Sequence, residues 1–389
     1  MMAEKKDGSS EAEAQADHAM RLRRLPEARR LLEQAVAQTP ARSVTWLKLA
    51  STCRAVGDHQ AGLAAVSRAL ELDPLDFSAL LAKAALLKAA GQSLAAGQAY
   101  GEALANMPPQ EQVTPGLRAV IESARAGYAG FQDAQLAALE AQVPTQATDE
   151  ERSRLRRFCT NIARTTKAYP QEPSHFHYPG LPAAEFHERR HFPWLSDLEA
   201  ATAMIVGEYQ AVAAARDASF APYVQYPQDL PLRQWKELNH SERWTAIHLI
   251  KNGHVVEENA RRCPGTMALL ETLPQPRIAE HGPNAMFSLL APRTRIPPHT
   301  GVSNARLVCH LPLIVPPDCS FRVGAETRRW EPGRAFVFDD TIEHEARNDS
   351  DALRVVLIFD IWPWALSPGE REAVAAITAA TALRPAEGL

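Results

Sequence analysis

The sequence lacks the long apolar runs that mark a membrane span or a secretory leader. Over its 389 residues, no stretch approaches the roughly 18 uninterrupted apolar residues that a membrane helix needs. Residues 1 to 20 contain no apolar segment of the kind that opens a secreted protein. We therefore expect a cytoplasmic protein with no membrane partner.

An excess of positive charge is also missing, and cysteine is scarce. The chain has 42 Lys and Arg against 46 Asp and Glu, a net charge of -4, which gives no basic footprint for nucleic acid. Its five cysteines are odd in number and scattered, without a CxxC pair, which argues against both a disulfide framework and a thiolate zinc site. We expect these thiols to be reduced and buried in the core.

What is present first is a repeat. Pro40, Pro74 and Pro108 recur at a spacing of 34 residues, and an alanine lies five residues before each of them. Small residues and glycines keep the same register, so each unit predicts two short amphipathic helices that approach closely and end at a proline. The pattern resembles the tetratricopeptide repeat over residues 11 to 112, an α-solenoid whose groove would hold a protein or peptide partner. The alternative is that three repeats only cap the next domain.

A helical bridge and linker are predicted between residues 113 and 174. Residues 115 to 142 continue as helix, and Thr148 with Glu151 forms a capping box that opens another helix reaching Lys167. Closely spaced prolines then exclude a long helix between residues 168 and 194, where we place the domain boundary. Ser196 with Glu199 predicts a second capping box, opening a helix that reaches about residue 215.

From residue 220 onward the hydrophobic pattern becomes strand-like. Short apolar runs alternate with turn residues, as in Asn252-Gly253 and Pro332-Gly333, which favours an antiparallel sandwich or barrel. The predicted runs are residues 244–250, 285–290, 306–315, 320–323, 335–338 and 354–362. One helix, over residues 264 to 273, interrupts them. The fold class is therefore multidomain, an α-solenoid followed by an all-β double-stranded β-helix (jelly roll).

Two histidines are candidates for a metal site. His299 is expected in the turn before a strand, and His344 lies 45 residues later, near the start of the next-to-last strand. Two imidazoles from separate strands can hold one face of Fe(II) and leave positions open for a chelating co-substrate and oxygen. The usual third ligand, an acid two residues after the first histidine, is replaced by Gly301. From spacing alone, two histidines with ordinary hydrogen bonds remain the alternative.

Arg354 points to an anionic co-substrate. It lies ten residues after His344, on the next predicted strand. A guanidinium inside a barrel needs a carboxylate, because an unpaired buried charge is costly. The distal carboxylate of 2-oxoglutarate would satisfy it with two parallel hydrogen bonds. The alternative is a core ion pair with an aspartate, namely Asp339, Asp340 or Asp360.

At this point the sequence resembles the aspartyl/asparaginyl β-hydroxylase family. The resemblance covers residues 175 to 380, and the blocks that carry it are residues 287–292, 297–301, 304–316 and 330–345. Helical repeats in front of the catalytic domain are also that family's usual arrangement. The resemblance implies iron held by two histidines without an acid, which makes Gly301 an expected feature.

The resemblance also implies roles for individual residues. His299 and His344 would be the iron ligands, and Ser288 and Arg354 would hold the distal carboxylate of 2-oxoglutarate. Other residues that match family positions are His310 at the proximal carboxylate, Trp244 in the pocket wall, Arg306 at the substrate carboxylate and Asp340 as an acid outside the iron's ligand sphere. Val308 departs from the family, because vertebrate enzymes carry a second arginine at that position.

The function implied is hydroxylation at the β-carbon of Asp- or Asn-type residues in a protein or peptide, dependent on Fe(II), 2-oxoglutarate and O2 and releasing succinate and CO2. Hydroxylation of a free amino acid is an alternative. So are a repeat-based interaction protein with a degenerate barrel and a metal enzyme that uses the same barrel without 2-oxoglutarate.

Overall fold

The computed structural model describes residues 8–37, 42–215, 220–227 and 231–381, and they divide into two compact units. The first unit ends at Thr165 and the second begins at Thr166. None of the helices in these stretches is both long and apolar enough to cross a bilayer. All five cysteines are free and buried, as expected.

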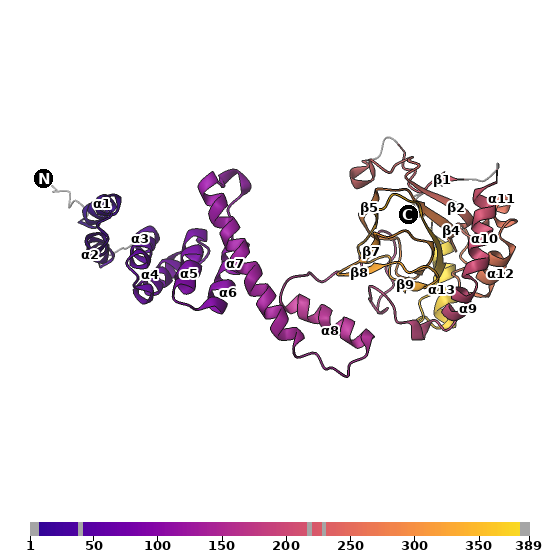
Figure 1. The fold of residues 1–389 in the computed structure, drawn as a ribbon, viewed down its shortest axis with the longest axis horizontal. Coiled ribbons are helices and arrows are strands. Elements are labelled where there is room, and N and C mark those ends of the chain that lie inside the picture. Colours follow the sequence, from indigo (N-terminus) through magenta and orange to yellow (C-terminus); the bar gives the residue numbers. More distant parts are fainter. Residues whose placement is uncertain (1–7, 38–41, 216–219, 228–230, 382–389) are drawn as a thin grey trace. The chain divides into compact units, whose positions relative to one another are not determined.

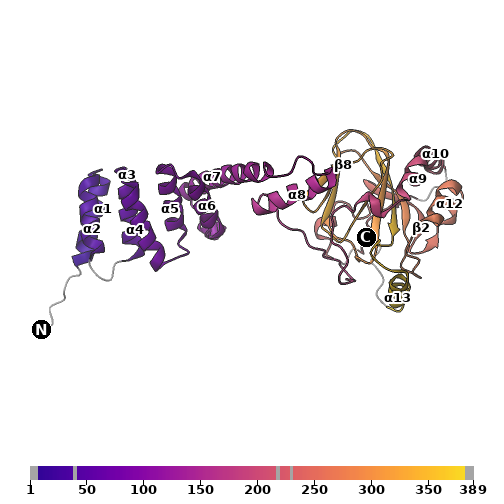
Figure 2. The ribbon, with the colours of Figure 1, turned by 90° about the horizontal axis from the view of Figure 1, so that it is seen from below.

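The first unit is helical, and consecutive helices pair as antiparallel hairpins that contact the next hairpin along the chain (Figure 2). The helices are α1 (Gly8–Arg21), α2 (Leu25–Val36), α3 (Ser43–Ala55), α4 (His59–Leu72), α5 (Phe77–Ala89), α6 (Ser93–Ala105), α7 (Pro115–Glu140) and α8 (Asp149–Ile162). The second helices of the hairpins begin at Leu25, His59 and Ser93, so the 34-residue spacing is confirmed (59 − 25 = 34 and 93 − 59 = 34).

Side-chain caps and close helix contacts explain this regularity. Asp58 and Asp76 cap α4 and α5 by accepting hydrogen bonds from backbone N–H groups. Gly62 packs so close to the next hairpin that a Cβ there would lie 2.6 Å from Leu86. Pro40, one of the three spaced prolines, lies outside the described residues.

Two helix predictions in the linking region need correction. The Thr148–Glu151 capping box is confirmed, but α8 ends at Ile162, short of Lys167. The second capping box is wrong: α9 (Leu195–Ala200) begins after Trp194 without a side-chain cap. The chain turns at Ala201 into a separate helix, α10 (Thr202–Ala213).

The second unit contains two antiparallel sheets with a helical layer on one side (Figure 1). The larger sheet comprises β1 (Ala221–Pro222), β2 (Trp244–Lys251), β4 (Ala285–Leu290), β11 (Arg354–Ile361), β6 (Leu307–Ile314) and β9 (Phe336–Phe338) in that order, with β3 (His254–Val255) paired to β2. The smaller sheet has the order β5 (Thr294–His299), β10 (His344–Asn348), β7 (Cys319–Val323) and β8 (Glu326–Arg329).

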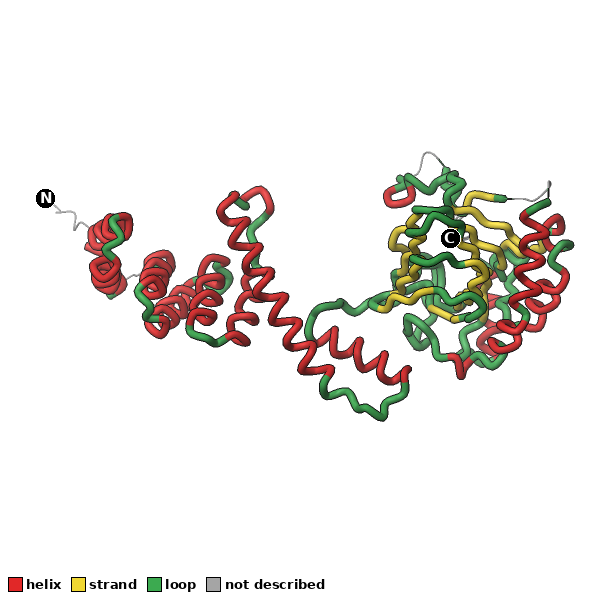
Figure 3. Tube along the Cα trace, in the orientation of Figure 1, coloured by secondary structure: helices red, strands yellow, loops and turns green. Residues whose placement is uncertain are grey.

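The two faces of the larger sheet have different partners, which follows from the two-residue period of a strand. On β11, Val355, Leu357, Phe359 and Ile361 belong to a core formed with helices α9, α10 and α12 (Pro264–Thr272), the red layer beside the yellow strands in Figure 3. The alternate residues face the smaller sheet. A second core, which includes Val356, therefore fills the space between the two sheets.

Most strands match the predicted runs, but some elements were missed. His299 was expected in a turn, and it is instead the last residue of β5, whose Pro297 and Pro298 hid the strand in the sequence. Further missed elements are β8, the short α11 (Glu257–Ala260) and the C-terminal α13 (Pro368–Ala379).

Candidate active site

A pocket opens between the two sheets of the second unit. It is lined by every residue that the sequence singled out, namely Trp244, Ser288, His299, Arg306, His310, Asp340, His344 and Arg354. These residues come from strands of both sheets and from the loops before β6 and β10. Residues separated by more than 100 positions in the sequence therefore share one cavity.

His299 and His344 lie side by side at the end of the smaller sheet. β5 ends at His299 and β10 begins at His344, and the two residues are direct partners in the antiparallel register. Their ring centroids are 4.0 Å apart. The Nδ1 atoms lie 2.8 Å and 3.1 Å from the carbonyl oxygens of Pro297 and Ile342, respectively. An Nδ1–H that donates to a carbonyl fixes the tautomer and leaves Nε2 as the metal-binding atom.

Both imidazoles are neutral at neutral pH, as metal ligands must be. Burial lowers the pKa of His299 to about 4. Burial, together with the neighbouring His299, holds the pKa of His344 well below its usual value. Within the described residues, no group of three or more His, Cys, Asp or Glu side chains gathers to hold a metal. Neutral imidazoles are common ligands of Fe, Zn, Cu and Ni, so the pair is a candidate metal site.

Arg354 is a buried cation that has no anionic partner in the described part of the chain. It is the first residue of β11, only 2% exposed, and no acid lies within ion-pair distance of it among the described residues. Its Nη1 donates to the backbone oxygen of Ser288 at 3.2 Å and to Ser288 Oγ at 3.4 Å, while its Nε has no partner. Burial lowers its pKa to about 10. The alternative of a core ion pair with an aspartate is therefore wrong.

The surroundings of Arg354 are aromatic and polar rather than acidic. The guanidinium lies 4.9 Å from the centroid of the Trp330 ring. Trp330 Nε1 points at His310 Nδ1 at 3.4 Å, and Trp244 Nε1 donates to Ser288 Oγ at 3.2 Å. Burial and the nearby Arg354 keep the pKa of His310 well below its usual value, so this ring is neutral and its Nε2–H is a potential donor.

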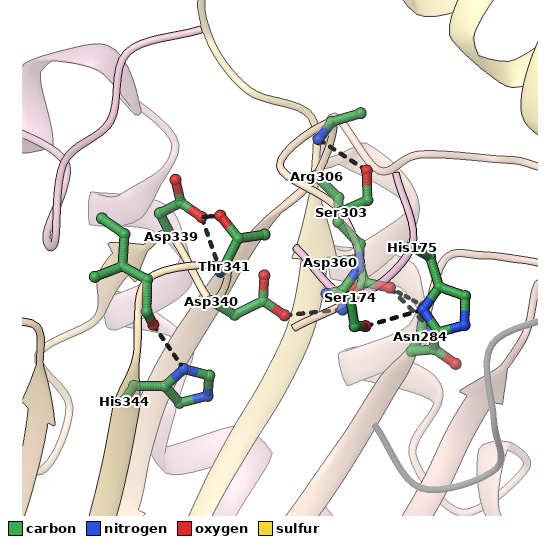
Figure 4. A network of polar contacts seen from close by, with 12 residues as sticks. Ser174, His175, Asn284, Ser303, Arg306, Asp339, Asp340, Thr341, His344 and Asp360 are labelled. Atoms are coloured by element: carbon green, nitrogen blue, oxygen red, sulfur yellow. Dashed lines mark hydrogen bonds and ion pairs between the residues drawn. The ribbon is translucent and has the colours of Figure 1, made fainter. Parts of the chain in front are cut away.

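Arg306, just before β6, is paired where Arg354 is not. Its Nη1 donates to Asp360 at 2.7 Å and its Nη2 to Asp340 at 2.9 Å (Figure 4). Although burial opposes it, the two carboxylates raise the pKa of Arg306. Asp360 also accepts from the backbone N of Asn284 at 2.7 Å.

Asp340 occupies the space that a side chain at Gly301 would fill. A Cβ on Gly301 would lie 2.0 Å from Asp340 Oδ2, so only glycine fits while the carboxylate stays in place. The other oxygen, Oδ1, is buried without a partner, and burial raises the pKa of Asp340 to about 7. An acid thus reaches the neighbourhood of the histidine pair from residue 340, although residue 301 carries none.

Several pocket residues were missed by the sequence analysis. Tyr223 stacks on Trp244 with ring centroids 3.8 Å apart. Asp360 was considered only as an ion-pair partner of Arg354, although its position six residues after Arg354 on one strand places it on the same side. The other missed lining residues that matter below are His248, Lys251, His281 and Asn284. His248 lies on β2, and Lys251 ends that strand beside the Asn252-Gly253 turn, whereas His281 and Asn284 lie in the segment before β4, where no periodic pattern identifies them.

With this geometry in place, the chain can be compared with known proteins. Residues 199–363 match the model of the aspartyl/asparaginyl beta-hydroxylase family.

Individual relatives cover different lengths of the chain. It is 36% identical over 135 residues to the aspartyl/asparaginyl beta-hydroxylase of Mus musculus, which is 34% of this chain and 18% of the mouse protein. It is 31% identical over 216 residues to aspartate beta-hydroxylase domain-containing protein 2 of Xenopus tropicalis (54% and 55%). An ornithine lipid ester-linked acyl 2-hydroxylase of Rhizobium tropici is 33% identical over 172 residues (43% and 57%). The chain therefore spans 18% to 57% of these relatives' lengths.

Solved structures overlap the chain only weakly. The Sgt2 TPR domain of Aspergillus fumigatus gives a TM-score of 0.28 at 17% identity, covering 37% of this chain and 89% of that one. An oxidoreductase of the 2OG-Fe(II) oxygenase family from Burkholderia pseudomallei gives 0.25 at 9% identity, covering 48% and 94%. Scores at this level carry no assignment.

Proposed function

We propose that this protein is an Fe(II)- and 2-oxoglutarate-dependent hydroxylase whose two-sheet domain is a double-stranded β-helix. The observation that carries the proposal is Arg354, a buried guanidinium that no carboxylate of the described residues pairs with, in the same pocket as a neutral histidine pair. A protein does not gain stability from an isolated buried charge, so the charge is best explained by a ligand that arrives with the opposite sign.

The residues around Arg354 fit one end of a dicarboxylate. Ser288 Oγ accepts hydrogen bonds from Trp244 and Arg354, which leaves its own O–H free to donate. Arg354 Nε is likewise free. Together they offer donors to a single carboxylate, and charge-assisted bonds of this kind are roughly twice as strong as neutral ones. His310, through its Nε2–H, would reach the other carboxylate of 2-oxoglutarate.

The histidine pair fits Fe(II) through its two Nε2 atoms, with 2-oxoglutarate, O2 and water available for the remaining positions. When bound, the iron would use O2 to oxidise 2-oxoglutarate to succinate and CO2 and to insert oxygen into a C–H bond of the substrate. The protein's own part is to hold the ligand set in a fixed orientation. The Pro297 and Ile342 carbonyls orient the rings, and the buried aromatic wall limits access of water.

For the substrate, the family resemblance favours hydroxylation at the β-carbon of an Asp- or Asn-type residue in a protein or peptide. We propose that the protein meets this substrate in the cytoplasm. Arg306 would contact a substrate carboxylate, and Asp340 would hold water beside the iron. Both side chains line the pocket, and Arg306 is 17% exposed. The tetratricopeptide-like hairpins would hold the flank of a long substrate.

The proposal is tested by measuring 2-oxoglutarate binding without O2 and succinate release with O2, each with and without Fe(II). We expect metal-dependent binding in the wild type and in Arg329→Met, since Arg329 is an exposed arginine of β8. Arg354→Met should bind 2-oxoglutarate far more weakly. Equal binding by the two variants would refute the assignment.

The role of the repeats is tested by deleting residues 11 to 108. A groove that holds the substrate flank makes delivery of the reacting side chain intramolecular, so hydroxylation of a long peptide should weaken while that of a short peptide changes little. Substrate-free turnover of 2-oxoglutarate should be nearly unchanged. Loss of turnover with every substrate, or an insoluble barrel, would instead identify the repeats as a structural cap.

A further inference from the structure

We infer that the pocket contains a second anion-binding subsite, formed by Lys251, His248 and His281, which holds a carboxylate or phosphate group of the substrate. Neither the iron ligands nor the co-substrate residues include these three side chains, although all of them line the same pocket. As an assignment to the substrate, the inference rests on the proposed function.

The subsite lies at the opposite end of the cavity floor from Arg354. Along the larger sheet, Ser288 pairs with Ala246, and the next pocket-facing pair is Met286 with His248. On β11 the corresponding sequence runs from Arg354 through Ile358 to Asp360. The pocket therefore extends along β2 away from Arg354. The strand ends at Lys251, beside the hairpin turn.

Among the described residues, Lys251 and the Nδ1 atom of each of the two histidines have no hydrogen-bond partner. Lys251 is half-buried and has no acid within ion-pair distance among the described residues. The Nδ1 atoms of His248 and His281 are buried and unpartnered. Burial and the charge of Lys251 lower the pKa of His248 to about 4, so this ring is neutral and can donate only one N–H.

Nearby acids do not neutralise Lys251. Asp340 and Asp360 face the same pocket, but both are bonded by Arg306. Asp360 receives two further hydrogen bonds from Asn284, at 2.7 Å and 3.1 Å. Among the described residues, no acid therefore pairs with Lys251 at this end of the cavity.

The backbone holds the subsite in place. The Asn252-Gly253 turn after Lys251 is tied to the segment that follows His281, with Asn252 N donating to Asn284 Oδ1 at 2.9 Å and Gly253 N donating to the Pro283 oxygen at 3.0 Å. Gly253 has a positive φ of 84°, and a Cβ there would lie 2.8 Å from the Gly282 oxygen, so glycine is required. Preorganised donors of this kind lower the cost of binding an anion.

A hydroxylase with this pocket would select substrates that carry an anionic group apart from the reacting carbon. The anion would rest at Lys251, and the carbon would lie toward the histidine pair. Acidic peptides, free acidic amino acids and phosphorylated small molecules share this chemistry. A neutral substrate of the same shape would leave Lys251 and both imidazoles unsatisfied and would bind less well.

The test uses full-length, metal-free protein carrying isotope-labelled histidine and follows the imidazole resonances by NMR during titration with inorganic phosphate and, separately, with acetate. We expect saturable shifts at His248 and His281, and the anion that binds more tightly would indicate whether the substrate group is phosphoryl or carboxylate. Lys251→Met should weaken binding at least about tenfold, the value of one charge-assisted hydrogen bond. Lys236→Met, an exposed lysine outside the pocket, should behave as wild type.

The same titration in Arg354→Met separates this subsite from the co-substrate end. Shifts that persist in Arg354→Met and are lost in Lys251→Met would support the inference. Absence of saturable shifts, equal affinities in the two lysine variants, or loss of the shifts in Arg354→Met would overturn it. Failure of the wild type to bind 2-oxoglutarate with Fe(II) would refute the proposed function but would leave the anion-binding result standing.

Discussion

Arg306 and Arg354 line the same pocket, yet they are satisfied in opposite ways. Arg306 is bonded to two carboxylates, whereas Arg354 contacts Ser288 and the face of Trp330. Arg306 therefore balances its charge within the folded chain, and no acid among the described residues does so for Arg354. A buried cation in a pocket indicates a ligand only when the protein itself supplies no anion, and the sequence does not reveal which arginine meets that condition.

The largest effect we expect is on turnover, and it follows from replacing either histidine of the candidate metal pair. His299→Ala and His344→Ala should each abolish iron binding and metal-dependent succinate release, because each removes one of the two proposed protein ligands. Thermal unfolding of the metal-free variants should remain cooperative. Wild-type turnover in either variant would show that the metal is held elsewhere.

The second effect concerns the stability that Arg306 gains from its ion pairs with Asp340 and Asp360. Arg306→Met should lower the free energy of unfolding by about 3 to 5 kcal/mol, because it leaves Asp340 and Asp360 buried without their cation. The loss should grow with pH: burial already raises the pKa of Asp340 to about 7, and a protonated Asp340 carries no charge to leave unpaired. Urea unfolding at about pH 6 and about pH 8 measures both effects. If Arg306→Met were as stable as the wild type, the ion pairs of Arg306 would not stabilise the fold, and the two arginines would not differ in this respect.

The third effect concerns the binding of 2-oxoglutarate by Arg354. Arg354→Met should weaken 2-oxoglutarate binding by about 2 to 5 kcal/mol, the usual cost of removing one partner of a buried charge pair. The unfolding free energy of the ligand-free variant should be equal to or above that of the wild type, because a buried charge has been replaced by an apolar chain. Calorimetric titration and urea unfolding of the same preparation test the two halves together. A strongly destabilised variant would mean that Arg354 has a structural partner.

The sequence predicted which residues line the pocket better than it predicted which of them contact one another. The alternation along β11 is a local periodic pattern, and the strand follows from it, whereas His299 and His344 were assigned as a pair from the family resemblance. The missed strand β5 shows the limit, because two consecutive prolines resemble a loop although an edge strand tolerates them.

The partners of the arginines depend on which side chains meet across the sheet, which no local pattern encodes. Asp340 precedes β10 and Asp360 lies on β11, and both reach Arg306 only through tertiary packing. The position of Lys251 beside the segment that carries His281 depends likewise on a turn docked by two hydrogen bonds.

The fourth effect concerns the close contact between Gly301 and Asp340, the carboxylate that pairs with Arg306. Gly301→Ala should lower the unfolding free energy by about 1 to 3 kcal/mol, the usual cost of overpacking, because the new methyl group would displace the Asp340 carboxylate from Arg306. Gly130→Ala serves as the control, since a Cβ there meets nothing within 4 Å. In the Asp340→Asn background the cost of Gly301→Ala should change, and strict additivity would show that the two residues do not interact.

The smallest effect separates the charge of Arg354 from its hydrogen-bonded neighbour. Ser288→Ala removes a hydroxyl that accepts from Trp244 and Arg354 and that would donate to the ligand, so 2-oxoglutarate should bind about 0.5 to 1.5 kcal/mol more weakly. The backbone bond from Arg354 to the Ser288 oxygen remains, which is why the loss should stay below that of Arg354→Met. In a double-mutant cycle, Ser288→Ala should cost less when Arg354 is already methionine, because both side chains would grip the same carboxylate. Independent, additive losses would mean that Ser288 only supports the wall of the pocket, and the clamp would then consist of Arg354 alone.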